Sequence, residues 1–517
     1  MAQQATKTRK RQRGAARRER TSGPQQLPWR AISNPFRPVE ILSADQLETI
    51  HRASLKILEQ MGLEIMSPEA LDLLESAGAK VDRDSQIVRI GAELIEQALA
   101  TAPSQVTLTP RNPAHAVTLG GDHVVFGLVA GPPNVHDMER GRRPANLDDY
   151  RDLLRLAQSL NIVHVVGNQP VPPIELPAET RHLDCYLANV TFTDRVYHCT
   201  AIGAERARDG IEMMALSRGV TLEQMIDEPG VLTIISVNSP RRFDGAMLDG
   251  LITMARLGQV VVVTPFTLMG AMTPVTLAAA LAQQNAEALA GVLITQLARP
   301  GAPVVYGAFT SNVDLRSGAP AFGTPENAQA TMAAGQLARR YGLPYRSSNA
   351  NASNLVDAQA AYESEMSLWS SLMGGANLIY HGAGWLEGGL TASFEKVVLD
   401  AELMQMMAET MTPLQVDEAS LALETIGEID PGGHFFGTQH TIDRYQSAFY
   451  EPMLSDWRNY EAWEEAGGLS ATQRATAVWK QLLADYQAPA LDPAVAEALE
   501  AFVARRKEEI ARDGLEA

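Results

Sequence analysis

The segment Val260-Val-Val-Val-Thr264 decides the fold, because four consecutive valines are too apolar for a strand with one solvated face. Helical segments flank it at 242–257 and 274–298. An apolar strand between two helices is typical of a parallel sheet that helices cover from outside. The segment therefore predicts one unit of a repeated β–α fold.

The same pattern recurs through the middle of the chain. Seven more β-rich runs alternate with helical segments, at 124–126, 162–166, 196–198, 232–236, 303–306, 343–346 and 378–381. Eight such units predict an α/β fold, a closed (β/α)8 TIM barrel. An open doubly wound sheet is the alternative. No Gly-x-Gly-x-x-Gly follows the first strand, which argues against a dinucleotide site of that kind.

Three further regions surround the predicted barrel, which we assign to 116–396 as the catalytic domain. Residues 1–36 are expected to form a disordered basic tail, and residues 37–115 a mostly helical N-terminal cap whose first helix begins after Ser43. Residues 397–517 are expected to form a C-terminal helical extension that serves packing or self-association, so a homo-oligomer is expected. The basic cluster of the tail comprises Lys7, Arg9, Lys10, Arg11, Arg13, Arg17, Arg18 and Arg20.

Composition narrows the possible partners. The formal net charge of −18 disfavours nucleic acid, although a nucleic-acid or membrane-surface role of the tail is an alternative. No apolar run after the tail is long enough for a signal peptide or a membrane span. The two cysteines, Cys185 and Cys199, give no disulfide framework, so we expect a cytoplasmic protein.

In a barrel of this kind, the loops after the carboxyl ends of the strands carry the function. These strand ends are rich in amides, hydroxyls, glycines and aromatic rings. They hold no metal-ligand spacing, no paired carboxylates of the glycosidase type and no lysine for Schiff-base chemistry. A zinc enzyme, a glycosidase and an aldolase or lyase are therefore disfavoured. The composition favours a site that binds a small polar or cationic molecule.

Some strand-end residues stand out as candidates. Aromatic rings there can hold a quaternary ammonium group by cation–π attraction. Because a strand alternates its faces, Tyr380 and His381 are not expected to point inward together, and we expect His381 to face inward or toward the loop. The glycine-rich loop containing Gly382 and Gly384 would allow a large flat cofactor to approach the backbone. Glu363 would place a carboxylate near a cation. For His381 and Glu363, a purely structural role is the alternative.

Several segments, in order, resemble the trimethylamine methyltransferase family. The resemblance implies a barrel methyltransferase with no tightly bound cofactor, acting with a separate corrinoid protein. In that reaction the cobalt(I) of the corrinoid takes the methyl group of a methylated amine. The resemblance rests on Val262–Leu277, Gly301–Gly307, Gly323–Glu326, Gln336–Pro344, Asp357–Gln359 and Gly433–Gly437.

This chain departs from the family pattern at one point. The family's archaeal trimethylamine enzymes carry pyrrolysine in the barrel, whereas this chain has ordinary residues across 347–353. A quaternary amine yields a neutral leaving group without such activation. Glycine betaine is therefore the first expected substrate. The alternatives are trimethylamine as substrate and a non-catalytic protein that kept the barrel and binds quaternary amines or has a regulatory role.

The resemblance and the strand ends together give expected roles. His381 and Asn349 would orient the substrate, Glu363 would act as its counter-charge, and Gly382 and Gly384 would face the cofactor. No metal ligand is expected. The expected substrate-binding residues are Phe126, Asn168, His198, Thr264, Tyr306, Phe309, Arg346, Gln359 and Trp385, with Phe309 and Trp385 as walls of the cage.

Overall fold

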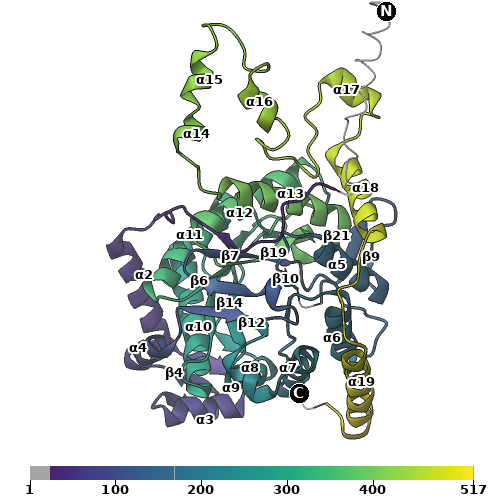
Figure 1. Ribbon diagram of the computed structural model, residues 1–517. Helices are drawn as coiled ribbons and strands as arrows, with labels where there is room; N and C mark the ends of the chain where they lie inside the picture. The colour runs from purple at the N-terminus through teal and green to yellow at the C-terminus, as the bar shows by residue number, and fades with distance from the viewer. Residues whose placement is uncertain (1–23, 168, 516–517) are drawn as a thin grey trace, which may run out of the picture.

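The computed structural model describes residues 24–167 and 169–515, and eight of its parallel strands close into a barrel (Figure 1). Each strand pairs with the next in chain order, and β19 pairs back with β7. The prediction of a TIM barrel is confirmed, and the open sheet is excluded. The strands are β7 (His123–Leu128), β10 (Val165–Val166), β11 (Val196–His198), β12 (Val231–Val237), β14 (Val260–Met269), β15 (Val304–Gly307), β18 (Tyr345–Ser348) and β19 (Leu378–Ala383).

A helix follows each of the eight barrel strands and covers the outside of the barrel. The eighth, α13 (Phe394–Thr410), packs on β19, so the barrel runs to Thr410 and the boundary expected at 396 falls inside this helix. The other seven are α5 (Leu147–Ser159), α6 (Arg181–Phe192), α7 (Ala204–Arg218), α9 (Gly245–Arg256), α10 (Leu277–Ala298), α11 (Pro325–Arg340) and α12 (Ala358–Met373), with the short α8 (Leu222–Asp227) between α7 and β12.

Among the described helices, only α10 is long and apolar enough by composition to cross a membrane. Of the apolar stretch of α10 that meets this criterion, 83% is buried within the protein. It packs on β14 and β15 with one face. The N-terminal helices α2 (Ala44–Lys56), α3 (Pro68–Ser76) and α4 (Ala92–Thr101) contact it elsewhere. A helix enclosed in this way can be apolar on most of its surface, and a buried polar residue such as Asn285 bonds within the protein.

The N-terminal cap combines these helices with small sheets. Ser43 caps α2 in a capping box with Gln46, as expected. The helix ends in the π-helical turn η1 (Ile57–Met61). One sheet holds β2 (Leu63–Ile65), β3 (Lys80–Asp82), β4 (Ile87–Arg89) and β13 (Arg242–Phe243); a hairpin holds β5 (Gln105–Leu108) and β6 (Val117–Gly120), with the 3-10 turn η2 (Pro113–His115) between them.

The hairpin of β5 and β6 belongs to the apolar core at the amino ends of the barrel strands, here called the floor. Its Leu108 and Leu119 cluster with inward-facing Val196, Leu232 and Val260. Residues 24–36, which the sequence assigned to a disordered tail, instead pack on the barrel, and β1 (Ile32–Ser33) pairs antiparallel with β7. The predicted basic cluster of residues 7–20 lies outside the described residues.

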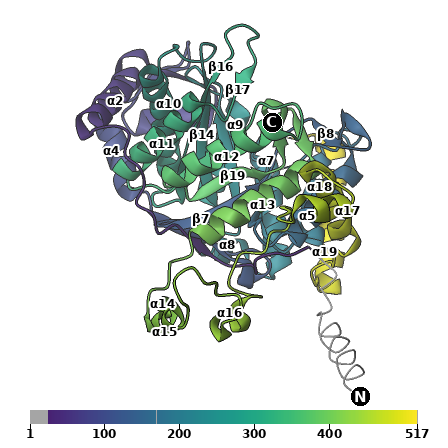
Figure 2. The same cartoon turned by 90° about the horizontal axis from the view of Figure 1, so that it is seen from above.

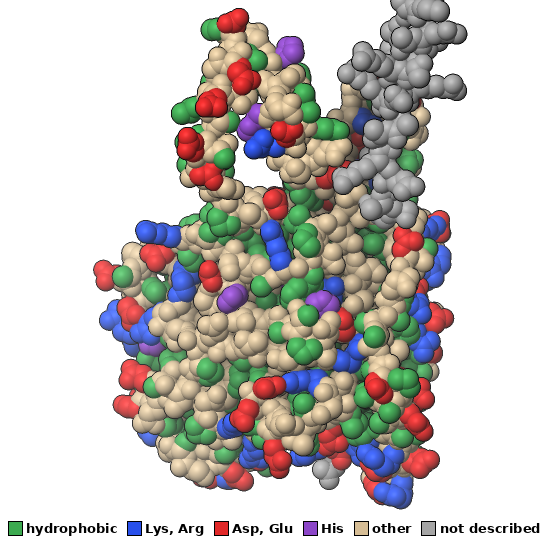
Figure 3. Space-filling view, in the orientation of Figure 1, with side chains coloured by type: hydrophobic (Ala, Val, Ile, Leu, Met, Phe, Trp, Pro, Cys, Tyr) green, Lys and Arg blue, Asp and Glu red, His purple; other side chains and the backbone are tan. Residues whose placement is uncertain are grey.

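The C-terminal extension consists of a projecting arm and two packed helices. Residues 412–450, which we call the arm, stand away from the barrel (Figures 1 and 2) and hold α14 (Glu418–Leu421), α15 (Leu423–Gly427) and α16 (Gln439–Arg444). After α17 (Tyr460–Glu465), α18 (Ala471–Ala484) packs on α13 and α5, and α19 (Pro493–Asp513) packs on α6 and α7. Acidic and apolar side chains share the surface of the arm (Figure 3).

Candidate functional site

Short strands build a rim beyond the carboxyl ends of the barrel strands, which we call the mouth. The long strand β14 continues past the barrel and pairs with β16 (Phe309–Val313), which pairs with β17 (Pro320–Ala321). A second small sheet contains, in this order, β20 (Trp385–Leu386), β21 (Thr391–Ser393), β8 (Asn134–Asp137) and β9 (Gly141–Pro144). The 3-10 turn η3 (Glu387–Gly389) lies between β20 and β21.

Five rings converge at the mouth and form what we call the aromatic cluster: Phe266, Phe309, Phe322, His381 and Trp385. The ring centroid of Phe309 lies 5.2 Å from those of Phe266 and Phe322 and 5.7 Å from that of Trp385. The centroids of His381 and Trp385 are 4.5 Å apart. The structure thus brings together His381, Phe309 and Trp385 as the sequence predicted. Aromatic faces grouped in this way can hold a cation.

His381 reaches this cluster through a strained backbone. Its φ is +55°, and the register between β19 and β7 shifts between Ile379 and Ala383. A non-glycine residue with positive φ costs roughly 1–2 kcal/mol and often marks a functional site. The bulge turns His381 toward Phe309 and Trp385, while Tyr380 points into the barrel. The expectation that strict alternation would keep one of the two residues away was therefore wrong.

The hydrogen bonds of His381 and His198, the two histidines at the mouth, indicate that both imidazoles are neutral. The backbone N–H of Ala130 donates to Nδ1 of His381 over 3.2 Å, which leaves the proton on Nε2. The N–H of Ile234 donates to Nε2 of His198 over 3.1 Å, so Nδ1 of His198 donates to the Tyr380 hydroxyl over 2.5 Å. Burial, with help from the Arg346 charge, lowers the pKa of His198 to about 3 and that of His381 well below its usual value.

Arg346 is the buried charge inside the barrel. Only 1% of its surface is exposed, and its guanidinium lies 5.3 Å from the Phe309 ring and 5.5 Å from the Tyr380 ring. Its Nε and Nη1 have no hydrogen-bond partner, and no carboxylate among the described residues pairs with it. Burial lowers the pKa of this guanidinium to about 10, so it stays charged at neutral pH.

Other buried polar atoms near the mouth also lack partners: Thr264 Oγ1, Ser348 Oγ, Asn349 Oδ1 and Asn351 Oδ1. Gly307 pairs with Arg346 across the sheet, and a Cβ at Gly307 would lie 2.0 Å from Thr264 Oγ1. Thr264, Gly307 and Arg346 therefore lie side by side on three neighbouring strands. Native proteins satisfy nearly all buried polar groups, so a cluster of exceptions indicates a place built for a ligand.

Glu363 of α12 supports the loop that follows β18. Its Oε2 accepts hydrogen bonds from the backbone N–H groups of Ala352, at 2.8 Å, and Ser353, at 3.0 Å. Its Oε1 accepts from the Gln359 side chain at 2.8 Å. Because both oxygens are engaged by the protein, the structure places Glu363 as a loop anchor and not as the free counter-charge that we expected.

A second buried network supports the loop that carries His381 and Trp385. Lys396 and Asp400 of α13 form an ion pair with both side chains fully buried. The other carboxylate oxygen of Asp400 accepts the Gly384 N–H at 2.8 Å, and Lys396 donates to Ser364 at 2.7 Å. Asn349 donates to the Gly382 carbonyl at 2.9 Å, so it too holds this loop.

Several predicted site residues lie elsewhere. Alternate residues of a strand face the helices, which explains why Phe126 stacks near His164 and why Tyr306 hydrogen-bonds Asn285 of α10. Gln359 is exposed at the start of α12. Asn168 lies outside the described residues.

The two glycines expected to face a cofactor instead allow close packing within the protein. A Cβ at Gly382 would lie 2.9 Å from Met404 Sδ, and one at Gly384 would lie 2.8 Å from Val397 Cγ2. Both contacts are with α13. The loop is therefore glycine-rich because it lies directly against a helix.

Sequence reasoning missed Phe322, the inward position of Tyr380, and the pair Lys396 and Asp400. The spacing of four between Lys396 and Asp400 on a helix was a visible signal for an ion pair. Nothing local marks Phe322, which reaches the aromatic cluster only because β17 pairs back on β16.

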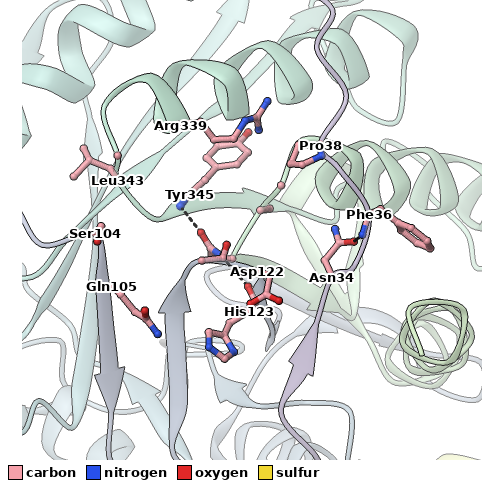
Figure 4. Close-up of a pocket in the computed structure, with 15 residues that line it drawn as sticks. Asn34, Phe36, Pro38, Ser104, Gln105, Asp122, His123, Arg339, Leu343 and Tyr345 are labelled. Carbon is pink, nitrogen blue, oxygen red and sulfur yellow. Dashed lines mark hydrogen bonds between the residues drawn. The ribbon is translucent and has the colours of Figure 1, made fainter. Parts of the chain in front are cut away.

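A cavity of about 600 Å³ lies at the floor, beside the amino ends of β7, β18 and β19 (Figure 4). Gln105, Asp122, His123 and Arg339 are among its lining residues. The Asn377 amide bonds the backbone of Tyr345, Gly121 and His123 there. None of the cavity's lining residues carries a buried polar atom without a partner. In TIM barrels this end serves stability, whereas function resides at the mouth.

The described residues include no group of three or more His, Cys, Asp or Glu side chains that could hold a metal ion. Cys185 and Cys199 are both buried and free. The described residues at the mouth present aromatic faces, two neutral imidazoles, one guanidinium and a set of hydroxyls and amides.

Comparison with known proteins adds the family. A family model described as trimethylamine methyltransferase (MTTB) matches residues 7–511. A glycine betaine methyltransferase of Desulfitobacterium hafniense (strain Y51) is 36% identical over 474 residues, which cover 92% of this chain and 98% of that protein. The trimethylamine methyltransferase MttB of Desulfitobacterium hafniense (strain DSM 10664 / DCB-2) is 29% identical, over 90% of this chain and 94% of that protein.

A solved structure shares the fold. The monomethylamine methyltransferase MtmB of Methanosarcina barkeri aligns with a TM-score of 0.51 at 12% identity, over 89% of this chain and 88% of that chain. At this identity the likeness concerns the fold alone. The family match covers nearly the whole chain, and the resemblance inferred from separate segments is confirmed. The chain belongs to the trimethylamine methyltransferase family and is a methyltransferase.

Proposed function

We propose that this enzyme transfers a methyl group from a quaternary amine, with glycine betaine as the first candidate, to the corrinoid of a partner protein. The aromatic cluster at the mouth carries the proposal, because it offers to a cation the faces of four aromatic rings and the neutral imidazole of His381. The similarity to a glycine betaine methyltransferase supports this choice.

The proposed reaction is a displacement at carbon. The N–CH3 bond breaks with its electron pair staying on nitrogen, and the methyl carbon accepts an electron pair from the reduced cobalt of the acceptor. A quaternary nitrogen leaves as a neutral tertiary amine, so the enzyme need not supply a proton. Its contribution is to hold the methyl group in line with the acceptor, and positioning of this kind can lower a barrier by several kcal/mol.

The residues divide into two groups in this proposal. Phe309, His381 and Trp385 touch the ammonium group, with cation–π attraction of about 0.5–2 kcal/mol per ring in a dry site. Glu363 and Asn349 are positioning residues, since their hydrogen bonds hold the loops that carry the cluster.

The mouth also has a surface that suits a protein acceptor. Seven of the eight βα connections each expose one large apolar side chain, from 47% to 75% of its surface. Exposed large apolar side chains that gather around one opening can mark a protein interface. We propose that the corrinoid protein docks on this ring, which consists of Met138, Ile174, Ile202, Val275, Leu315, Leu355 and Leu390.

The test is a methyl transfer assay. Purified protein is mixed with Co(I) cobalamin, or with a corrinoid protein encoded near its gene, and with glycine betaine, choline or trimethylamine. Formation of methylcobalamin is followed by absorbance, and we expect it with glycine betaine. If glycine betaine binds and no acceptor gains a methyl group, the proposal fails and a non-catalytic binding protein is the better description.

The docking surface has its own control. Leu315→Glu introduces a charge on the apolar ring at a residue that is not part of the aromatic cluster. We expect this variant to raise the KM for the corrinoid protein about tenfold while leaving transfer to free cobalamin unchanged. Equal losses with both acceptors would contradict docking on this ring.

We also propose a cytoplasmic location and self-association through the arm. Leu414, Phe436 and Phe449 on the arm are 84–87% exposed, an unusual state for large apolar side chains. Deletion of 415–449 should lower the number of subunits per particle, measured by analytical ultracentrifugation as molar mass relative to the mass of the shortened chain. An unchanged number of subunits would contradict this role of the arm.

A further inference from the structure

We propose that Arg346 binds the carboxylate of the substrate, so that the site selects quaternary ammonium carboxylates over quaternary amines without an acid group. This inference deepens the proposed function and rests on it. It identifies the substrate class from Arg346, which lies deeper in the barrel than the aromatic cluster.

The first support is that Arg346 has unused donors. A guanidinium carries five N–H groups, and Nε and Nη1 of Arg346 have no partner although 99% of the residue is buried. A guanidinium binds a carboxylate with two parallel hydrogen bonds through Nε and Nη2 or through Nη1 and Nη2, so each of the two unpartnered nitrogens belongs to one such pair. Thr264 Oγ1 and Ser348 Oγ, also without partners, add hydroxyl donors on the same inner wall.

A second support comes from a comparison with Arg195, another buried arginine. Arg195 lies just before β11 at the floor, and its guanidinium donates to the backbone carbonyls of Val163 and Gln158. Burial lowers the pKa of both arginines to about 10. Arg195 thus bonds the backbone through both Nη atoms and leaves only Nε without a partner, whereas Arg346 leaves both Nε and Nη1 without one. A charge that is buried without a partner destabilises a fold, so its retention indicates a ligand.

A third support is the effect of Arg346 on a bare cation. Choline or tetramethylammonium at the aromatic cluster would face the Arg346 charge with no carboxylate between them. Because the guanidinium lies 5.3 Å from the Phe309 ring, the two positive charges would repel each other in a dry site. A betaine places its own negative charge between them.

The geometry also sets the orientation of the substrate. Arg346 lies on β18 within the barrel, and the aromatic cluster lies on strands that continue beyond it. A zwitterion therefore binds with its carboxylate inward and its N-methyl groups toward the open mouth. This orientation presents a methyl carbon to an acceptor that arrives from outside.

The experiment measures binding to the full-length protein by isothermal titration calorimetry, with glycine betaine and choline as probes. We expect wild-type protein to bind glycine betaine at least about a hundredfold more tightly than choline. Arg346→Gln should lose about a hundredfold in affinity for glycine betaine and bind choline no worse than wild type. Arg346→Lys, which keeps the charge but not the two parallel bonds, should lose about tenfold.

The matched control is Arg195→Gln, and the second readout is the thermal midpoint. Arg346→Gln should leave the midpoint unchanged or raised, because it removes a buried unpaired charge. Arg195→Gln should lower the midpoint and leave the affinity for glycine betaine unchanged. This opposite pattern is not expected if Arg346 only supports the fold.

Two results would overturn the inference. One is glycine betaine binding to Arg346→Gln within threefold of wild type, and the other is equal affinity of wild type for choline and glycine betaine. In either case methyl transfer from a quaternary amine would still stand as the proposed function. Failure of wild type to bind any quaternary amine would overturn both.

Discussion

The cavity at the floor and the site at the mouth differ in their buried polar groups. The floor has the cavity of about 600 Å³, and none of the residues that line it has a buried polar atom without a partner. The mouth has a histidine at φ +55°, an arginine without a carboxylate and a set of hydroxyl and amide atoms without partners. Backbone strain and unsatisfied polar atoms are costly, so they persist where a ligand is bound. The volume of a cavity carries no such cost and therefore locates function less well.

The largest effect is expected behind the mouth, at the buried pair of Lys396 and Asp400. Lys396→Met should lower the free energy of unfolding by about 3–5 kcal/mol, because it leaves a buried carboxylate without its partner. The double variant with Asp400→Asn should recover most of this loss, since an amide oxygen can still accept the Gly384 N–H. Urea unfolding measures both. An equal loss in the two variants would show that the charge pair is not the cause.

The next effect concerns His381. His381→Ala removes one wall of the aromatic cluster and should lower kcat/KM for the amine by roughly tenfold to a hundredfold. The matched floor variant is His123→Ala, which lines the cavity in Figure 4 and should change kcat/KM by less than about twofold. Steady-state methyl transfer measures the two variants side by side. Unchanged activity of His381→Ala would remove its proposed role.

A smaller effect is expected in the pH dependence of stability, which the buried histidines at the mouth share with His164, whose pKa burial also lowers to about 3. His198 and His381 have lowered pKa values in the folded state, mainly through burial and then through Arg346. In the unfolded chain each titrates near 6.5, so the unfolded state binds more protons as pH falls. The stability that these neutral histidines contribute is complete above about pH 6.5 and is lost progressively as pH falls toward the value of about 3 for His198.

The measurement is the thermal midpoint between pH 8 and pH 4. We expect a plateau above pH 6.5 and a decline below it. His198→Asn should have a shallower decline, because one buried imidazole no longer titrates. An identical slope in this variant would contradict the assignment.

The smallest effect is expected when the floor cavity itself is changed. Gln105→Leu adds apolar volume at its edge and should leave kcat/KM within about twofold, because the substrate is expected at the opposite end of the barrel. A large loss of activity would break the contrast between the two ends and would assign a function to the cavity.

Much of the fold could be predicted because each β–α unit is a local pattern. All eight predicted strands correspond to barrel strands, and the family resemblance follows from segments in order. The end of the barrel was placed too early because α13 continues helically from Phe394 to Thr410 without a break near 396. Residues 24–36 were assigned to the tail because the pairing of Ile32 with Val124 joins segments far apart in the sequence.

The candidate site could be predicted only in part. Composition and strand-end position were enough to indicate His381, Phe309, Trp385 and Arg346 as candidates. Glu363 was assigned to the cation because nothing local shows that the N–H groups of residues 352 and 353 reach its carboxylate. Tyr306 was included because a strand-end position does not reveal which face of the strand it occupies.

The sequence by itself determined the alternation of apolar strands and helices, the absence of strand-end lysine and metal spacing, and the family. These depend on residues that are neighbours along the chain. The tertiary structure decided which polar atoms remain without partners, how the bulge turns His381 toward Trp385, and that Arg346 is buried without a carboxylate. The physical reason is that hydrogen-bond satisfaction and burial depend on groups hundreds of residues apart, which come together only when the barrel closes.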